Sequence, residues 1–180
     1  MRHFAVSAVG RDRPGIVAAV ARVLLERGLN VEDSQMTILC GHFTMMLVVS
    51  GADDLDEAAL RADLDGVGEE LGLESVALAD VEEIGASAQP SPSHVVTVYG
   101  TDHPGIVHAV AAALAESGVN ITDLNTRLVS EEGEEPLYAM MMEVELPAGL
   151  TAEQLEKSLA GVRREQEVEV SVRPLEQDVL

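Results

Sequence analysis

The sequence has few of the side chains that nucleic-acid-binding proteins use. Its 180 residues include no Trp and only two Phe and two Tyr, so bases would find almost no aromatic rings to stack on. Eleven Lys and Arg stand against 32 Asp and Glu, and the net charge of −21 repels a phosphate backbone. We therefore expect no direct contact with DNA or RNA.

Cysteine and long apolar runs are also scarce. Cys40 is the single cysteine, which excludes an internal disulfide and a thiolate zinc site within one chain and suits a reducing cytosol. We expect Cys40 to be a small buried apolar residue. No apolar run is long enough for a signal peptide or a membrane span, so we expect a cytoplasmic protein without membrane contact.

A segment near the start of the chain occurs a second time. GRDRPGIV at 10–17 returns as GTDHPGIV at 100–107, and the match continues at this offset of 90 to Asp33 and Asp123. Further on the offset is 95, because the second copy has five extra residues within the acidic run SEEGEEP at 130–136. The pattern stays in register on both sides, which is typical of a longer hairpin loop.

Each copy predicts the same order of elements. An alternating apolar segment predicts a strand, Pro14 or Pro104 is suited to the first position of a helix, and Gly28 or Gly118 is suited to the end of that helix. Two strands, a helix and a last strand follow. This βαββαβ order is the ferredoxin-like α+β arrangement, in which both helices cover one face of a four-stranded antiparallel sheet.

The duplication predicts two domains in tandem. The first covers 1–84 and the second 94–174, and a linker rich in small residues and proline joins them at 85–93. A short tail remains at 175–180. We expect the two modules to form a pseudo-twofold pair, and a homodimer of the chain is compatible with this arrangement.

The loop between the first strand and the first helix of each copy is a candidate binding site. Gly10 and Gly15 let a ligand approach the backbone closely, and the free N–H groups at a helix start attract an anion. Asn30 and Asn120, just after the helix, can both donate and accept hydrogen bonds. These groups suit a small zwitterion such as an amino acid. Alternatively, the same residues serve only as helix caps and turn formers.

The motif GxDxPGIV, followed by GLNVEDSQM or GVNITDLNT, resembles the ACT domain, a ferredoxin-like regulatory module that senses small molecules. The run NVEDSQMTILCGHFTMMLVVSG at 30–51 is similar to the first half of the glycine cleavage system transcriptional repressor family, whose members are tandem ACT proteins. In ACT domains ligands lie between two modules, at the loop before the first helix and the start of the second strand.

This resemblance implies two ligand sites. The residues of the first are Asp12, Arg13, Pro14, Gly15, Ile16 and Asn30. Those of the second are Asp102, His103, Pro104, Gly105, Ile106 and Asn120. Since His stands where the first copy has Arg, the two sites need not bind the same ligand.

The resemblance implies an amino-acid-sensing regulatory protein, with glycine as a candidate ligand, that acts through protein contacts. With its acidic charge, a repressor of this kind would work through a regulator protein that has its own DNA-binding domain. The alternative is a ligand-responsive regulatory subunit of an amino-acid or one-carbon metabolic enzyme.

We expect neither catalysis nor a cofactor or metal. Formyltetrahydrofolate deformylases carry a similar N-terminal module, but here a second copy stands in place of a catalytic domain. No nucleophile has a base at a recognisable spacing, and His103 and His108 are five residues apart, which is the wrong spacing for two metal ligands on one helix face.

Overall fold

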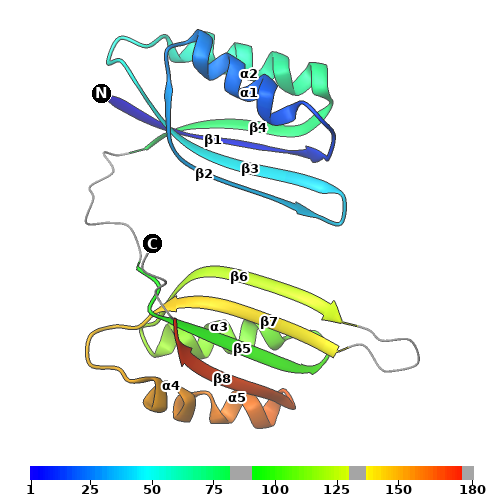
Figure 1. Cartoon of the computed structure of the whole chain (residues 1–180), viewed down its shortest axis with the longest axis vertical. Coiled ribbons are helices and arrows are strands. Elements are labelled where there is room, and N and C mark those ends of the chain that lie inside the picture. Colours follow the sequence, from blue (N-terminus) through cyan, green and yellow to red (C-terminus); the bar gives the residue numbers. More distant parts are fainter. Residues whose placement is uncertain (82–90, 130–136, 176–180) are drawn as a thin grey trace. The chain divides into compact units, whose positions relative to one another are not determined.

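The computed structural model describes residues 1–81, 91–129 and 137–175. The chain divides into two compact units, one on each side of 82–90 in the sequence (Figure 1). The predicted linker falls largely outside the described residues, as do the acidic run 130–136 and nearly all of the predicted tail. Among the described helices, none combines the length and the apolar character needed to cross a membrane.

Both units have the predicted order of strands and helices. The first unit consists of β1 (Arg2–Arg11), α1 (Ile16–Glu26), β2 (Asn30–Leu39), β3 (His42–Gly51), α2 (Glu57–Leu71) and β4 (Leu73–Val81). The second consists of β5 (His94–Thr101), α3 (Ile106–Glu116), β6 (Asn120–Val129), β7 (Leu137–Glu145), α4 (Ala152–Ser158), α5 (Ala160–Glu165) and β8 (Val168–Pro174). The second helix of the second copy is therefore divided in two, with a break at Leu159 that the periodicity did not predict.

Each unit contains one antiparallel four-stranded sheet. The strand orders are β2-β3-β1-β4 and β6-β7-β5-β8, so the two units have the same topology. The helices of each unit cover one face of its sheet (Figure 1). This arrangement confirms the α+β, ferredoxin-like prediction and leaves β2 and β6 at sheet edges.

Each unit has its own hydrophobic core between sheet and helices. Alternate residues of the central strands point toward the helices, as the strand period of two requires. In the first unit the completely buried members include Phe4, Val6, Val49, Val20 and Leu60. In the second unit they include Val96, Val98, Val110, Leu114 and Leu155. Burial of one such side chain contributes about 1.5 to 3 kcal/mol, so each core holds its unit together without a disulfide.

The ends of α1 and α3 confirm the predicted role of the two glycines. Gly28 has a φ of 69°, and its N–H donates to the Leu25 carbonyl at 3.0 Å, while the N–H of Leu29 donates to Leu24 at 2.9 Å. These two bonds form a Schellman motif, in which glycine takes the left-handed position. Gly118 has a φ of 70° and follows the same pattern.

Cys40 is exposed, so the prediction of a buried cysteine is wrong. It forms the two-residue turn between β2 and β3 together with Gly41, and their φ angles are 51° and 81°. Two successive positive φ angles are typical of a type I′ hairpin turn. The tight turn places Cys40 at the tip of the hairpin and away from the core.

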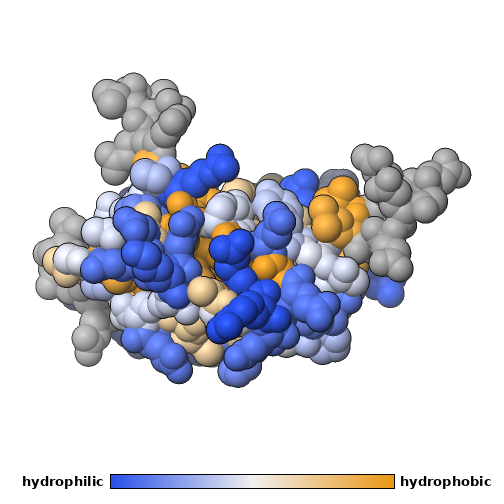
Figure 2. Space-filling model, turned by 90° about the horizontal axis from the view of Figure 1, so that it is seen from below, coloured by the Kyte–Doolittle hydropathy of each residue, from blue (hydrophilic) through white to orange (hydrophobic). Residues whose placement is uncertain are grey.

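The surface agrees with the acidic composition. Figure 2 shows one side of the molecule, on which hydrophilic residues predominate and hydrophobic residues occur in separate spots. The ion pairs of the described residues join acidic side chains to the few basic ones, as in Arg2 with Glu57 and Asp80.

Candidate functional site

The two site helices begin later than the sequence predicts. Pro14 and Pro104 are not the first helical residues, because α1 begins at Ile16 and α3 at Ile106. The residue before each helix is a glycine in the left-handed region, with a φ of 100° at Gly15 and of 110° at Gly105. No residue of a right-handed helix has this backbone conformation, so the helix cannot start before the glycine.

The starts of α1 and α3 have no side-chain cap. At α2 the carboxylate of Asp56 accepts from the Ala59 N–H at 3.0 Å. At α4 Thr151 and Gln154 form the capping box that the spacing of the run TAEQ at 151–154 predicts. In the part of the chain that the structure describes, no side chain accepts a cap hydrogen bond at α1 or α3. Asp12 and Asp102 therefore do not cap these helices, and the first-turn N–H groups stay available to an anion.

The five predicted loop residues of the first unit, 12–16, come together at one groove. The groove has a volume of about 450 Å³, and its lining also includes Val17 and Ala21 of α1, Met36 of β2 and Phe43 of β3. This volume lies in the range of small-molecule sites, about 300 to 1,000 Å³. Sequence reasoning missed Met36 and Phe43, although the alternation of apolar residues in β3 is a signal that can identify Phe43 as an inward-facing residue.

Within the loops, the two isoleucines belong to the core. Ile16 is 1% exposed and Ile106 is 2% exposed, so only their backbone groups can reach a ligand. The loop of the first unit also contacts the β2–β3 turn, because the N–H of Asp12 donates to the Gly41 carbonyl at 3.0 Å.

Arg13 and His103 both reach the carboxyl end of the second helix of their unit. Arg13 Nη2 donates to the Glu70 carbonyl at 3.1 Å. His103 Nε2 lies 2.9 Å from the Gln166 carbonyl oxygen, and its Nδ1 lies 3.2 Å from that of Pro104. A positive side chain is favourable at the carboxyl end of a helix, where carbonyl groups are unpaired. Both side chains therefore hold the loop to the helix.

The surroundings of His103 favour its charged form. The hydrogen bond to the Gln166 carbonyl raises the pKa of His103 most, followed by that to the Pro104 carbonyl. The negative charges of Asp102 and Glu167 raise this pKa further. An imidazole whose two nitrogens both face carbonyl oxygens can donate to both only as an imidazolium.

The two asparagines lie far from the loop of their own unit. In the first sheet Asn30 pairs with Ser50 of β3, whereas Gly10, next to the loop, pairs with Phe43. Seven residues of extended strand separate the two β3 positions, which is about 24 Å at about 3.4 Å per residue. Asn120 has the same place, opposite Glu145 at the far end of β7. The structure therefore brings the loop residues together but does not bring Asn30 or Asn120 to them within a unit.

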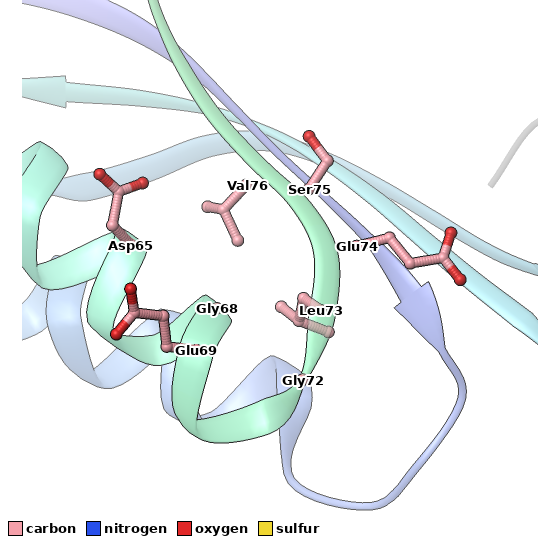
Figure 3. Close-up of a pocket in the computed structure, with 8 residues that line it drawn as sticks. All are labelled: Asp65, Gly68, Glu69, Gly72, Leu73, Glu74, Ser75 and Val76. Carbon is pink, nitrogen blue, oxygen red and sulfur yellow. The ribbon is translucent and has the colours of Figure 1, made fainter.

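A second hollow of about 320 Å³ lies between the end of α2 and the start of β4 (Figure 3). Leu73 and Val76 project between the helix and the strand, while the carboxylate of Glu74 points away from α2. Apart from the hydroxyl of Ser75, the side chains that line it are acidic or apolar, so it offers no cation to an anionic ligand. Within the described ranges, no group of three or more His, Cys, Asp and Glu side chains is placed to hold a metal ion. We assign no function to this hollow.

The family model described as ACT domain matches residues 2–77 and, a second time, residues 94–173. The chain belongs to the ACT domain family. Each match covers one unit, so the protein is a tandem of two ACT domains, as the motifs predict. ACT domains are regulatory modules, and this assignment supports a regulatory role for the chain.

Two groups of relatives match different lengths of the chain. A UPF0237 protein of Streptococcus mutans is 44% identical over 68 residues, which cover 38% of this chain and 77% of that protein. The phosphoserine phosphatase SerB2 of Mycobacterium tuberculosis is 30% identical over 169 residues, which cover 93% of this chain and 39% of the phosphatase. The second relative is therefore similar to both units together.

Solved structures share the whole fold. An unknown protein from Galdieria sulphuraria superimposes with a TM-score of 0.77 at 28% identity, over 97% of this chain and 98% of that one. A candidate glycine cleavage system transcriptional repressor superimposes with a TM-score of 0.74 at 20% identity, over 97% of both chains. At 20% identity, the similarity to the candidate repressor shows a common fold and nothing further.

Proposed function

We propose that this protein is an amino-acid-responsive regulatory protein that acts through contacts with another protein. One observation carries the proposal: α1 and α3 each begin on a left-handed glycine, and no side chain of the described residues caps them. By contrast, α2 and α4 have capping side chains, and α5, which has none, follows α4 directly. In the first unit that uncapped start lines a groove large enough for a small molecule. A ligand carboxylate satisfies the N–H groups that no side chain caps.

The expected affinity is modest. Each charge-assisted hydrogen bond from a first-turn N–H contributes about 1.5 to 3 kcal/mol, and the helix dipole adds about 0.3 to 1 kcal/mol. Glycine, with five heavy atoms, is limited to roughly −7.5 kcal/mol by a ceiling of about −1.5 kcal/mol per atom, which corresponds to micromolar binding at best. This range suits a sensor of a metabolite pool.

Asn30 and Asn120 take part only if two modules share a ligand. Because each asparagine lies at the far end of its own sheet, a small amino acid bound at one loop contacts an asparagine only from another module. We propose such a shared site, in which the ligand stabilises one arrangement of the modules and thereby changes a protein contact elsewhere.

A more specific version of this proposal is that the protein controls transcription. It rests on the likeness in fold to the candidate glycine cleavage repressor and on the 30–51 sequence run. With a net charge of −21 the protein acts through a regulator that itself binds DNA. Glycine is then the first ligand to test.

Calorimetry of the full chain against each of the twenty amino acids tests the proposal. We expect at least one to bind in the micromolar to millimolar range, and its carboxamide derivative, which lacks the carboxylate, to bind far more weakly. Flat titrations for all twenty would reject the proposed function. Equal binding of acid and amide would reject the helix starts as the site.

The second candidate function is regulation of an enzyme of amino-acid metabolism. The similarity of 169 residues of this chain to part of a phosphoserine phosphatase favours it, because there the same tandem belongs to a longer protein named as an enzyme. A pull-down from cell extract, with and without the ligand found by calorimetry, separates the two candidates. Recovery of a biosynthetic enzyme and of no transcription factor would reject the transcriptional form.

A further inference from the structure

A hollow of about 280 Å³ lies on the second sheet, on the face that the helices of this unit do not cover. In β7 the side chains of Met140 and Met142 are buried toward the helices. Those of Ala139 and Met141 alternate with them and therefore point to the opposite face (Figure 1). The side chains around the hollow come from three strands: Tyr99 of β5, Asn125, Arg127 and Val129 of β6, and Ala139 and Met141 of β7.

Strand pairing explains the hollow. Ala139 lies opposite Tyr99 on one side and opposite Arg127 on the other, so the three residues form one row across the sheet. Neighbouring strands are about 4.8 Å apart, which places the backbones of Tyr99 and Arg127 about 10 Å apart. The methyl group of Ala139 leaves the space between the two larger side chains open. Aromatic pairs prefer ring centroids about 4.5 to 7 Å apart, so a ligand ring fits beside Tyr99 in this space.

The lining combines apolar surface with one cation. Tyr99 is 45% exposed and Met141 is 48% exposed, and a phenol ring and a thioether both pack favourably against an aromatic ring. Arg127 is exposed, and the ion pairs among the described residues do not include it. A guanidinium binds a carboxylate through two parallel hydrogen bonds. The hollow therefore suits a ligand that has both a ring and a carboxylate.

The hollow offers no partner to an amino group. Among the residues that the structure describes, no acidic side chain belongs to its lining. The carboxylate of Asp123 accepts from the Asn125 amide at 2.5 Å, but Asp123 lies four residues before Arg127 on β6, about 14 Å away at about 3.4 Å per residue. One carbon separates the amine and the carboxylate of an amino acid, so it cannot contact both residues.

We propose that this hollow binds a small aromatic carboxylate that lacks an amino group. The ring packs over Ala139 between Tyr99 and Met141, and the carboxylate pairs with Arg127. The site lies on the opposite side of the sheet from α3, so the proposal does not rest on amino-acid binding at the helix starts.

The first unit provides an internal control, because its equivalent row has neither a ring nor a cation. At the offsets of the repeat, Val9, Thr44 and Thr37 stand in place of Tyr99, Ala139 and Arg127, and they pair in the same way. Met46 is the equivalent of Met141 and is 54% exposed. It lines a hollow of about 140 Å³ together with Asp33, whose carboxylate repels an anion.

NMR titration of the full chain labelled with ¹³C-methyl methionine tests the proposal, because Met141 reports on the hollow and Met46 on the equivalent place. The probe is hydrocinnamate, a phenyl ring joined to a carboxylate by two methylene groups. We expect the Met141 signal to move at a concentration at least about tenfold lower than the Met46 signal. L-phenylalanine adds only an ammonium group, and hydrocinnamyl alcohol lacks the charge. Each should bind at Met141 at least about threefold more weakly than hydrocinnamate.

Three exposed positions supply the variants. Arg127→Gln should weaken hydrocinnamate binding at Met141 by about 3- to 10-fold and leave binding of the alcohol unchanged. Tyr99→Val, which installs the residue of the first unit, should weaken the acid and the alcohol alike, by about 2- to 10-fold. Arg22→Gln in α1 is the matched control: it changes the net charge by the same amount and should leave both titrations unchanged.

Three results would overturn the proposal: a Met141 signal that does not move, Met141 and Met46 signals that move at the same concentration, and an equal loss of binding in Arg22→Gln and Arg127→Gln. L-phenylalanine that binds at Met141 as tightly as hydrocinnamate would overturn it too. None of these results decides the proposed function, because the helix starts are tested by the amide signals of their own first turns.

Discussion

In both ACT domains the chain leaves the first strand, turns through a glycine at a φ of 100° or 110° and enters a helix without a capping side chain. Both helices end in a glycine at a φ of about 70°. The side chains around this common backbone differ: Arg13 corresponds to His103, Met36 to Thr126 and Phe43 to Tyr138. The duplication thus preserves the backbone conformation at the helix start and varies the side chains beside it.

The largest expected effect tests whether the helix starts are built alike. Ile16→Ala and Ile106→Ala each remove a side chain that is at most 2% exposed, so each should destabilise its own unit by about 2 to 5 kcal/mol. Urea unfolding of the full chain measures the change. Val17→Ala, at a neighbour that is 47% exposed, is the control and should cost about 0.5 kcal/mol or less. A larger cost would mean that Val17 is covered.

The second effect tests the shared backbone conformation. Gly15→Ala and Gly105→Ala should each cost about 1 to 2 kcal/mol, because a Cβ is disfavoured at positive φ. At Gly15 the new methyl would meet no atom within 4 Å, so the cost there reports the backbone alone. Gly66→Ala within α2 is the matched control, also free of contacts, and should stabilise by up to about 1 kcal/mol. Stabilisation by Gly15→Ala in thermal unfolding would contradict the left-handed turn.

These backbone features also show where sequence reasoning succeeds. The βαββαβ order, the glycines after α1 and α3 and the capping box at Thr151 are local patterns, and each predicts its structure correctly. The predicted helix start at Pro14 is two residues too early. Proline does prefer the first helical position, but Gly15 directly after it adopts a positive φ, so the helix begins only at Ile16.

The rest of the site depends on contacts between distant segments. The bonds of Arg13 to Glu70 and of His103 to Gln166 join a loop to a helix more than fifty residues away, and no local pattern encodes them. Met36 looks like a core residue of an alternating strand, but β2 is a sheet edge, so its side chain lines a groove instead. The exposure of Cys40 follows from a hairpin turn, whereas the prediction followed the average burial of cysteine.

A third prediction concerns caps and should give a smaller effect. Thr151→Ala and Asp56→Ala should each cost about 1 kcal/mol, since each removes a hydrogen bond to a helix N–H. Asp12→Ala and Asp102→Ala should stay within about 0.5 kcal/mol, because these carboxylates cap nothing. Thermal unfolding of the four variants makes the comparison. A cost at Asp12 equal to that at Asp56 would show that Asp12 is a cap after all.

The smallest expected effect is the pH response of the second loop. The pKa of His103 is raised above its ordinary value of 6.5, so the stabilisation is fully present below that value and is lost as the pH rises through the raised pKa. The neutral ring then donates to only one of the two carbonyl groups. The amide signal of Gly105 should follow this titration in NMR, whereas that of Gly15, beside the permanently charged Arg13, should not.

His103→Arg should make the second loop insensitive to pH in this range, and Arg13→His should make the first loop sensitive. If the Gly105 signal still changes with pH in the His103→Arg variant as it does in the unchanged protein, a group other than His103 causes the pH response.

The most direct test of the binding proposal is an amide NMR titration of the full chain with the amino acid that calorimetry identifies, and then with its carboxamide derivative. We predict shifts at the first-turn N–H groups of α1 or α3, at 16–18 or 106–108, with the acid and not with the amide. Shifts confined to other parts of the chain, or identical for acid and amide, would contradict the proposal that an uncapped helix start holds the ligand carboxylate.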